Sequence, residues 1–383
     1  WYPKPAVYDA QGWHAMSYLD QGEFYSEFGN YKVNITLPKN YVVAATGQLM
    51  DESERAFLLS RNTPLVVEPT KPVKKDIFKK NAGTSDKQFP PSTTELKTIH
   101  YSAQNVIDFA WFADKRFFVQ HDTISLPENP SIDAYTFILP EKKTLWQNSV
   151  KLVKQAVHFY AQQLGNYPYP TVSVVCAPPN TASGGMEYPT ITLVNVFGAQ
   201  EKNLDVTIAH EVGHNWLQAM LATNERDHPW MDEGMNTYFE RKYTSNYYSA
   251  TTANRKDFKG RPLSADPGEV LLTFATDTHS DQPIETTSEA FTRNNYVAVA
   301  YTKAGLWMEK LEQTVGTVKM QQLMQSYFAQ WKMKHPQPQD FKQIADSICG
   351  PTVDSLFMLL DKTGPLPELQ LNGTTKLSVL YPT

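Results

Sequence analysis

One short stretch of the chain decides its fold class and its chemistry: His210-Glu211-Val212-Gly213-His214-Asn215-Trp216. Residues four apart on a helix lie on one face, so the side chains of His210 and His214 can bind one metal ion. Glu211 directly follows the first histidine and can reach a water molecule held by that ion. This pattern predicts a helix that carries a metal-dependent hydrolytic site.

The remaining ligand is expected from a second helix, which Asp232-Glu233 opens. Eighteen residues separate His214 from Glu233, enough for a loop to return the carboxylate to the two histidines. Two imidazoles and a carboxylate suit Zn²⁺, which in catalytic sites takes three protein ligands and keeps one position for water. We therefore predict one Zn²⁺ per chain, with Glu240, on the same helix face as Glu233, orienting a ligand histidine.

The expected chemistry is hydrolysis by a zinc-activated water. Bound Zn²⁺ lowers the pKa of its water towards about 7 and polarises a carbonyl group. Glu211 is predicted to act as the general base and then to pass the proton to the leaving amine. The developing oxyanion needs a second donor, for which a tyrosine from a later helix is the natural candidate.

The periodicity of the chain changes near residue 140. Before it, segments such as Tyr31–Leu37 alternate apolar and polar residues, as half-buried strands do. After it, segments such as 144–164 carry apolar residues at helical spacing. We predict an α+β protein with three parts: a β-rich domain at 1–140, a mainly helical domain at 141–364, and a tail at 365–383 that enters a further strand or domain.

Two stretches before residue 140 lack a clear period. Residues 1–30 are rich in aromatic and turn residues and are expected to be irregular. Residues 71–97 are polar and lysine-rich, and their interleaved acidic residues favour a solvated loop or hairpin tip over a binding segment.

Composition excludes some classes of partner and leaves others open. The net charge of −5 over 383 residues gives no indication of nucleic acid, and no apolar run reaches the roughly 18 residues of a membrane span. Cys176 and Cys349 are either two buried thiols or one disulfide. Because the chain starts at Trp1, the compartment stays open, with a secreted or periplasmic location favoured over the cytoplasm; the oligomeric state is also open.

Three motifs resemble a known family. The histidine motif and its eighteen-residue spacing to Glu233 are those of the gluzincin clan of zinc peptidases. Upstream, Gly184-Gly185-Met186-Glu187-Tyr188 is similar to the Gly-x-Met-Glu-Asn exopeptidase motif of M1 family aminopeptidases. Downstream, Tyr301-Thr302-Lys303-Ala304-Gly305 resembles the Tyr-x-Lys-Gly segment of that family. The motifs occur in the family's order, and the β-rich stretch before residue 140 extends the likeness over most of the chain.

The resemblance implies a fold and further site residues. The fold would be a partial N-terminal β-sandwich followed by a thermolysin-like catalytic domain. Glu187 would bind the free α-amino group of a peptide, and the backbone of Gly184–Met186 would pair with the substrate main chain. Tyr301 would donate to the oxyanion, with Tyr296 as the competing choice.

The chain also departs from the family pattern. Tyr188 stands where asparagine is usual, Asp232 where asparagine is usual, and Gly213 where alanine is commoner. By comparison with the family, the chain is expected to lack the start of the N-terminal domain and any C-terminal helical domain. Relatives carry an additional amine-site glutamate in the first domain, and the sequence assigns none here.

The predicted function is removal of N-terminal amino acids from peptides with a free N-terminus. One alternative is an endopeptidase of the thermolysin type. A second is a catalytically weak binding or scaffolding relative, and a third is epoxide opening, as in one branch of the family. The preferred N-terminal residue and the physiological substrate stay open, as does whether this shortened chain is active.

Overall fold

The computed structural model describes residues 1–62, 89–178, 184–196, 198, 200–249, 256, 260, 264, 266–367, 369–370 and 378–379. They belong to two compact units. The strand-rich unit comprises Gly29–His158 and Asn166–Val212, and the helix-rich unit comprises Trp1–Phe28, Phe159–Gly165 and Gly213–Thr383. The boundary predicted at residue 140 lies inside the strand-rich unit, and the predicted domains stay a prediction. Most of the lysine-rich stretch 71–97 lies outside the described residues.

The strand-rich unit contains a three-stranded sheet in the order β3-β6-β5, a two-stranded sheet β4-β7 and a five-stranded sheet in the order β11-β12-β10-β9-β8. Their bounds are β3 (Gly29–Pro38), β4 (Val42–Ala45), β5 (Gln48–Leu49), β6 (Leu96–Val106), β7 (Trp111–Asp114), β8 (Phe118–Leu126), β9 (Asn129–Ile138), β10 (Thr171–Cys176), β11 (Gly185–Met186) and β12 (Ile191–Val194). The helical segments that begin here are α1 (Glu52–Ser60), η2 (Pro140–Lys142), α2 (Ser149–Gln163) and α3 (Glu201–Leu217).

Strand β3 confirms the strand predicted at Tyr31–Leu37. It pairs antiparallel with β6, from Tyr31 opposite Ala103 to Pro38 opposite Leu96. Ile35 and Leu37 are buried, whereas Asn34 and Thr36 are exposed, because alternate side chains of a strand point to opposite faces.

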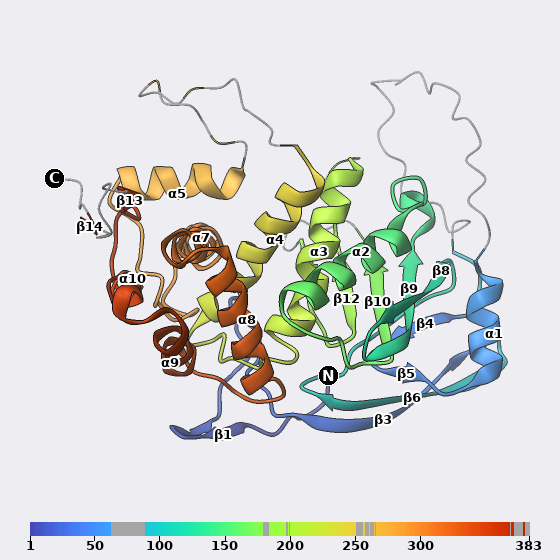
Figure 1. Cartoon of the computed structure of the whole chain (residues 1–383). Helices are drawn as coiled ribbons and strands as arrows, with labels where there is room; N and C mark the ends of the chain where they lie inside the picture. The colour runs from blue at the N-terminus through green and yellow to red at the C-terminus, as the bar shows by residue number, and fades with distance from the viewer. Residues whose placement is uncertain are drawn as a thin grey trace. The chain divides into compact units, whose positions relative to one another are not determined.

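The five-stranded sheet joins strands from both sides of residue 140. Strands β8 and β9, predicted as part of the β-rich domain before residue 140, lie in one sheet with β10, β12 and β11. β10 pairs in parallel with both β9 and β12, and all six of its residues are buried. A parallel strand covered on both faces reads as a continuous apolar run. The change of period near residue 140 therefore lies in the segment that connects β9 to β10 within one sheet. Figure 1 shows β8, β9, β10 and β12 side by side.

The helix-rich unit is built mainly from helices in its second half. They are η3 (Pro229–Met231), α4 (Glu233–Tyr247), α5 (Pro267–Asp277), α6 (Arg293–Asn295), η4 (Tyr296–Lys303), α7 (Ala304–Val315), α8 (Thr317–Trp331), α9 (Pro338–Cys349), η5 (Pro351–Val353) and α10 (Asp354–Phe357). Its short strands are β1 (Val7–Asp9), β2 (Gly12–His14), β13 (Leu369–Gln370) and β14 (Ser378–Val379). Buried aromatic side chains form much of its core, with Trp230 on Trp307 and Trp307 on Phe357.

Two elements of this unit were not expected from the sequence. Residues 1–30 were predicted to be irregular, but β1 and β2 form a hairpin with Val7 opposite His14. Three-residue strands are too short to show a period, and the turn depends on Gly12 at a φ of 108°. Helix α5 was also missed, although Asp266 caps it by accepting a hydrogen bond from the Gly268 amide.

Two smaller questions are answered by the described residues. Cys176 and Cys349 are both buried free thiols, so the disulfide alternative is wrong. Within the same residues, no helix combines the length and apolar character needed to cross a bilayer.

Gly213 in the middle of α3 is required by its neighbours. A Cβ atom there would lie 2.2 Å from Asn236 Oδ1 and 2.3 Å from the Tyr160 ring. Both residues are fully buried, and the Tyr160 hydroxyl donates to Asn236 Oδ1 over 2.9 Å. The Tyr160–Asn236 pair thus fills the space that a larger residue at 213 would occupy.

We expect Gly213→Ala to lower the free energy of unfolding by about 1–2 kcal/mol. Overpacking costs about 1–3 kcal/mol and exceeds the helix-propensity gain of about 0.5–1 kcal/mol. Urea unfolding measures the difference. An alanine variant as stable as the parent would contradict this packing, because the new methyl group would meet Asn236 Oδ1 as well as the Tyr160 ring carbon and hydroxyl.

Candidate metal centre and active site

Helix α3 presents the two predicted histidine ligands. It runs without interruption from Glu201 to Leu217, which places His210 and His214 one turn apart on the same face. His214 is fully buried and His210 half-buried. Neighbouring apolar residues such as Ile208 and Val212 are also buried, so the helix is covered on most sides.

The third predicted ligand begins helix α4. Glu233 follows η3, whose first residue is Pro229. Its Oε2 atom lies 3.3 Å from His214 Nε2. His210 lies on the same α3 face as His214, and the three residues form a candidate ligand group; their role as ligands stays a prediction.

The contacts of His214 test whether this group suits a metal ion. Its Nδ1 atom is 2.6 Å from Asp232 Oδ1, and a buried carboxylate at that distance assigns the proton to Nδ1. The Nε2 lone pair then faces the Glu233 carboxylate, so two acceptors lie 3.3 Å apart. Two ligands of a tetrahedral zinc, each about 2.0–2.1 Å from the metal, are separated by about 3.4 Å. The donor set and its spacing therefore fit Zn²⁺.

Asp232 is thus the residue that orients His214. A carboxylate behind a ligand histidine fixes the tautomer and raises the basicity of the ligand nitrogen. Glu240, proposed from the sequence for a role of this kind, is half-buried further along α4, and its role stays a prediction.

The tyrosine pair lies on η4, which is a π-helix. Hydrogen bonding from i to i+5 brings residues five apart to the same side, and the rings of Tyr296 and Tyr301 are 5.7 Å apart. The Tyr301 hydroxyl donates to Glu233 Oε1 over 2.6 Å, whereas the Tyr296 hydroxyl donates to Glu225 Oε1 over 2.7 Å. Tyr301, rather than the competing Tyr296, therefore touches a predicted zinc ligand.

Both tyrosines are held in the protonated form. Burial, followed by the nearby carboxylates, raises the pKa of Tyr301 and of Tyr296 well above its ordinary value. At neutral pH each hydroxyl is a hydrogen-bond donor.

Small residues allow the π-helix to approach α4. A Cβ atom on Gly234 would lie 2.4 Å from the Ala304 Cβ and 3.0 Å from the Ala300 carbonyl oxygen. Gly234 directly follows Glu233, so this close approach explains how Tyr301 reaches the carboxylate.

Two further carboxylates of the helix-rich unit were missed by the sequence reasoning. Burial and the negative charges of Asp232 and Glu233 raise the pKa of Glu225 well above its usual range. Burial and the charges of Glu233 and Asp232 raise the pKa of Glu23 to about 7. Both lie outside periodic segments, and the sequence carried no signal for them. Together with Asp232 and Glu233 they form an acidic cluster in this unit, and a bound cation would relieve the mutual repulsion that raises these pKa values.

The strand-rich unit carries the remaining predicted residues. β11 is the edge strand of the described five-stranded sheet, with Gly185 opposite Val194 on β12. A Cβ atom on Gly185 would lie 1.9 Å from Glu211 Oε1, whereas one on Gly184 would have no heavy atom within 4 Å. The structure therefore places Gly185, but not Gly184, directly against the predicted general base. Glu187, after β11, is buried.

We expect Gly185→Ala to lower kcat by at least about tenfold, because the new methyl group displaces the Glu211 carboxylate from its position. Zinc content should be unchanged. Steady-state kinetics of Gly184→Ala supplies the matched comparison, with a much smaller loss since that methyl meets no neighbour. Equal losses in the two variants would contradict a specific contact with Glu211.

Comparisons with known sequences match the region that carries these residues. Residues 148–359, more than half of the chain, match the model of the Peptidase family M1 domain. A leucine aminopeptidase 2 of Coccidioides immitis is 26% identical over 200 residues, covering 48% of this chain and 30% of the relative. A leukotriene A-4 hydrolase homolog of Botryotinia fuckeliana is 26% identical over 180 residues, covering 46% and 27%. The chain spans less than a third of the length of these relatives.

Solved structures share the fold. An M1 zinc metallopeptidase from Deinococcus radiodurans superimposes with a TM-score of 0.57 at 15% identity, covering 90% of this chain and 66% of that one. Legionella pneumophila aminopeptidase A in complex with aspartic acid gives a TM-score of 0.62 at 14% identity, covering 89% and 35%. These likenesses agree with the predicted α+β class.

Proposed function

Because the chain belongs to peptidase family M1, we propose that it is a zinc aminopeptidase that removes N-terminal amino acids from peptides. The observation that carries the proposal is the connected group at the start of α4. Asp232 orients His214, His214 faces Glu233, and Tyr301 donates to Glu233. This combines a zinc ligand set with a protonated hydroxyl donor.

Each residue has a defined task in this proposal. His210, His214 and Glu233 hold the metal. When bound, Zn²⁺ supplies a Lewis acid that lowers the pKa of water and polarises a carbonyl group. Glu211 takes a proton from the attacking water and passes it to the leaving amine. Tyr301 donates a hydrogen bond to the oxygen that becomes negative in the transition state.

Selectivity for N-terminal residues is assigned to acidic side chains and to β11. An edge strand can pair with an extended peptide as an additional strand, which supports substrate main-chain binding at Gly184–Met186. Glu187 is proposed to bind the substrate ammonium group. Glu23 is proposed as a second carboxylate for that group, since the charges of Asp232 and Glu233 act on it.

Glu187→Ala is expected to raise KM by roughly 10- to 100-fold, since a hydrogen bond to a charged group contributes about 1.5–3 kcal/mol. The zinc content should stay at that of the parent, because the proposed ligands are His210, His214 and Glu233; loss of zinc would instead favour the second candidate group, Glu187, His214 and Asp232. Kinetics on an aminoacyl reporter, together with metal analysis, measures both effects. Loss of zinc as the primary defect would contradict the assigned role.

N-acetylation of the substrate tests the proposal against the endopeptidase alternative. An aminopeptidase loses nearly all activity on an acetylated peptide, because the ammonium partner of Glu187 is gone. A thermolysin-type endopeptidase cleaves both forms, and retained cleavage of the acetylated peptide would overturn the proposal. A protein that binds stoichiometric zinc and cleaves neither form would be a binding or scaffolding relative.

A further inference from the structure

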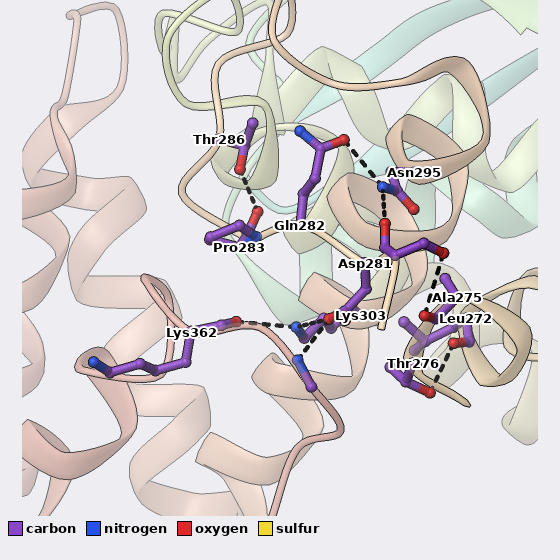
Figure 2. Close-up of polar contacts among 12 residues, drawn as sticks. Leu272, Ala275, Thr276, Asp281, Gln282, Pro283, Thr286, Asn295, Lys303 and Lys362 are labelled. Carbon is purple, nitrogen blue, oxygen red and sulfur yellow. Dashed lines mark hydrogen bonds and ion pairs between the residues drawn. The ribbon is translucent and has the colours of Figure 1, made fainter. Parts of the chain in front are cut away.

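Three consecutive residues, Ser280–Gln282, contact both ends of the π-helix η4. At its start, the Asn295 side-chain amide donates to the Ser280 carbonyl over 2.8 Å and to Gln282 Oε1 over 3.0 Å. Gln282 Oε1 also accepts from the Thr292 amide over 2.9 Å. Figure 2 shows Gln282 and Asn295 facing one another across this contact. We call Ser280–Gln282 the clamp.

The other end of η4 is held by a buried ion pair. Lys303 Nζ lies 2.9 Å from Asp281 Oδ2, and each side chain is only 2% exposed. Lys303 also donates to the Lys362 carbonyl over 3.1 Å, and Asp281 Oδ2 accepts from the Gly364 amide over 2.7 Å. Figure 2 shows Lys303 between Asp281 and Lys362.

The Asp281–Lys303 ion pair is important because a π-helix is a rare conformation and the same segment could instead form an α-helix. In an α-helix, residues five apart differ by about 140° around the axis. Tyr296 and Tyr301 could then not both face the carboxylates that they contact. Contacts at both ends of η4 oppose its conversion to the α-helical form.

A buried site does not by itself favour a pair of charged side chains, because both charges lose their hydration there. Burial lowers the pKa of Lys303, and the Asp281 carboxylate opposes that shift. Removing one charge leaves the other buried and uncompensated, so any test must neutralise both together. Because apolar residues often replace such pairs without loss of stability, a pair at this position points to a task beyond stability.

We propose that Asp281 and Lys303 are positioning residues, which act through η4 to hold the Tyr301 hydroxyl at Glu233. The inference rests on the proposed function, in which Tyr301 is the oxyanion donor. Gln282 serves the same purpose at the opposite end of the π-helix.

Amide hydrogen exchange of the full chain as purified tests the structural part directly. The double variant Asp281→Asn/Lys303→Met should speed exchange in peptides covering residues 292–304 by at least tenfold, because the π-helix loses one anchor. The control double variant Lys242→Met/Glu312→Gln removes a half-buried pair between α4 and α7 that does not touch the clamp. It should leave exchange in residues 292–304 at the parent rate. Unchanged exchange in the Asp281/Lys303 variant would overturn the proposal.

A kinetic cycle with Tyr301→Phe tests the functional part. Neutralising Asp281 and Lys303 should lower kcat by at least tenfold with KM changed less than twofold, since an oxyanion donor acts in the transition state. In a Tyr301→Phe chain the same change should cause no further loss. If neutralising Asp281 and Lys303 lowered kcat equally in the parent and in the Tyr301→Phe chain, the ion pair would act independently of Tyr301, and the proposal would be overturned.

The same data separate this proposal from the function on which it rests. If Tyr301→Phe alone keeps the parent kcat, the assigned role of Tyr301 fails, while hydrogen exchange still reports on the clamp. Should the double variant not fold, Gln282→Met removes the anchor at the other end of η4 without changing any charge. It should produce the same faster exchange and the same selective loss of kcat; parent values of both would overturn the proposal.

Discussion

Glu211→Gln should lower kcat by roughly 10²- to 10⁴-fold while the protein keeps its zinc, because glutamine cannot take a proton from the attacking water. The substitution preserves the size of the side chain, and Gly185 leaves the space that this side chain occupies. Glu211 is not among the candidate ligands of the metal centre. The Glu211→Gln variant should therefore bind zinc like the parent but hydrolyse substrate much more slowly.

The matched control is Glu201→Gln, the same chemical change at the start of the same helix. Glu201 is exposed and accepts a hydrogen bond from Asn148, so its loss should leave kcat within about twofold of the parent. Kinetics and metal analysis on both proteins complete the comparison. A Glu211→Gln protein that retains more than a tenth of the rate, or that loses its zinc, would refute the role of general base.

Tyr301→Phe should lower kcat by about 10²- to 10³-fold with little change in KM, as expected for loss of one oxyanion donor. Only the hydroxyl that donates to Glu233 is removed, and the half-buried ring stays in place. Because the pKa of Tyr301 is raised, its hydroxyl stays protonated through neutral pH. The parent rate should accordingly show no loss from ionisation of Tyr301 in this range.

Tyr296→Phe is the matched control, since Tyr296 lies on the same π-helix and also donates to a carboxylate, that of Glu225. We expect its kcat to fall much less than that of Tyr301→Phe. A larger loss in Tyr296→Phe would reverse the assignment and make Tyr296 the oxyanion donor.

The candidate ligand group could be proposed from the sequence because its spacing is local. His210 and His214 are separated by one helical turn, and the return of Glu233 depends only on a loop and a helix start. Helices α3 and α4 occur where the histidine motif and Asp232-Glu233 predict helices.

Contacts between distant segments were less predictable. The pairing of β9 with β10 depends on strands that are far apart in sequence, and periodicity identifies a strand without identifying its partner. The sequence does not distinguish the π-helix from an α-helix, because a shift from four to five residues per hydrogen bond leaves the apolar pattern nearly unchanged. Glu23 and Glu225 come from segments without a period, so only their surroundings in the fold identify them.

The most direct test of the account is the rate at which the purified chain hydrolyses a panel of aminoacyl reporters before and after removal of metal. The account predicts hydrolysis of at least one reporter, a loss of at least about 100-fold on chelation, and recovery on addition of one equivalent of Zn²⁺. Full activity of the chelated protein, or no hydrolysis of any reporter by a protein holding stoichiometric zinc, would contradict it.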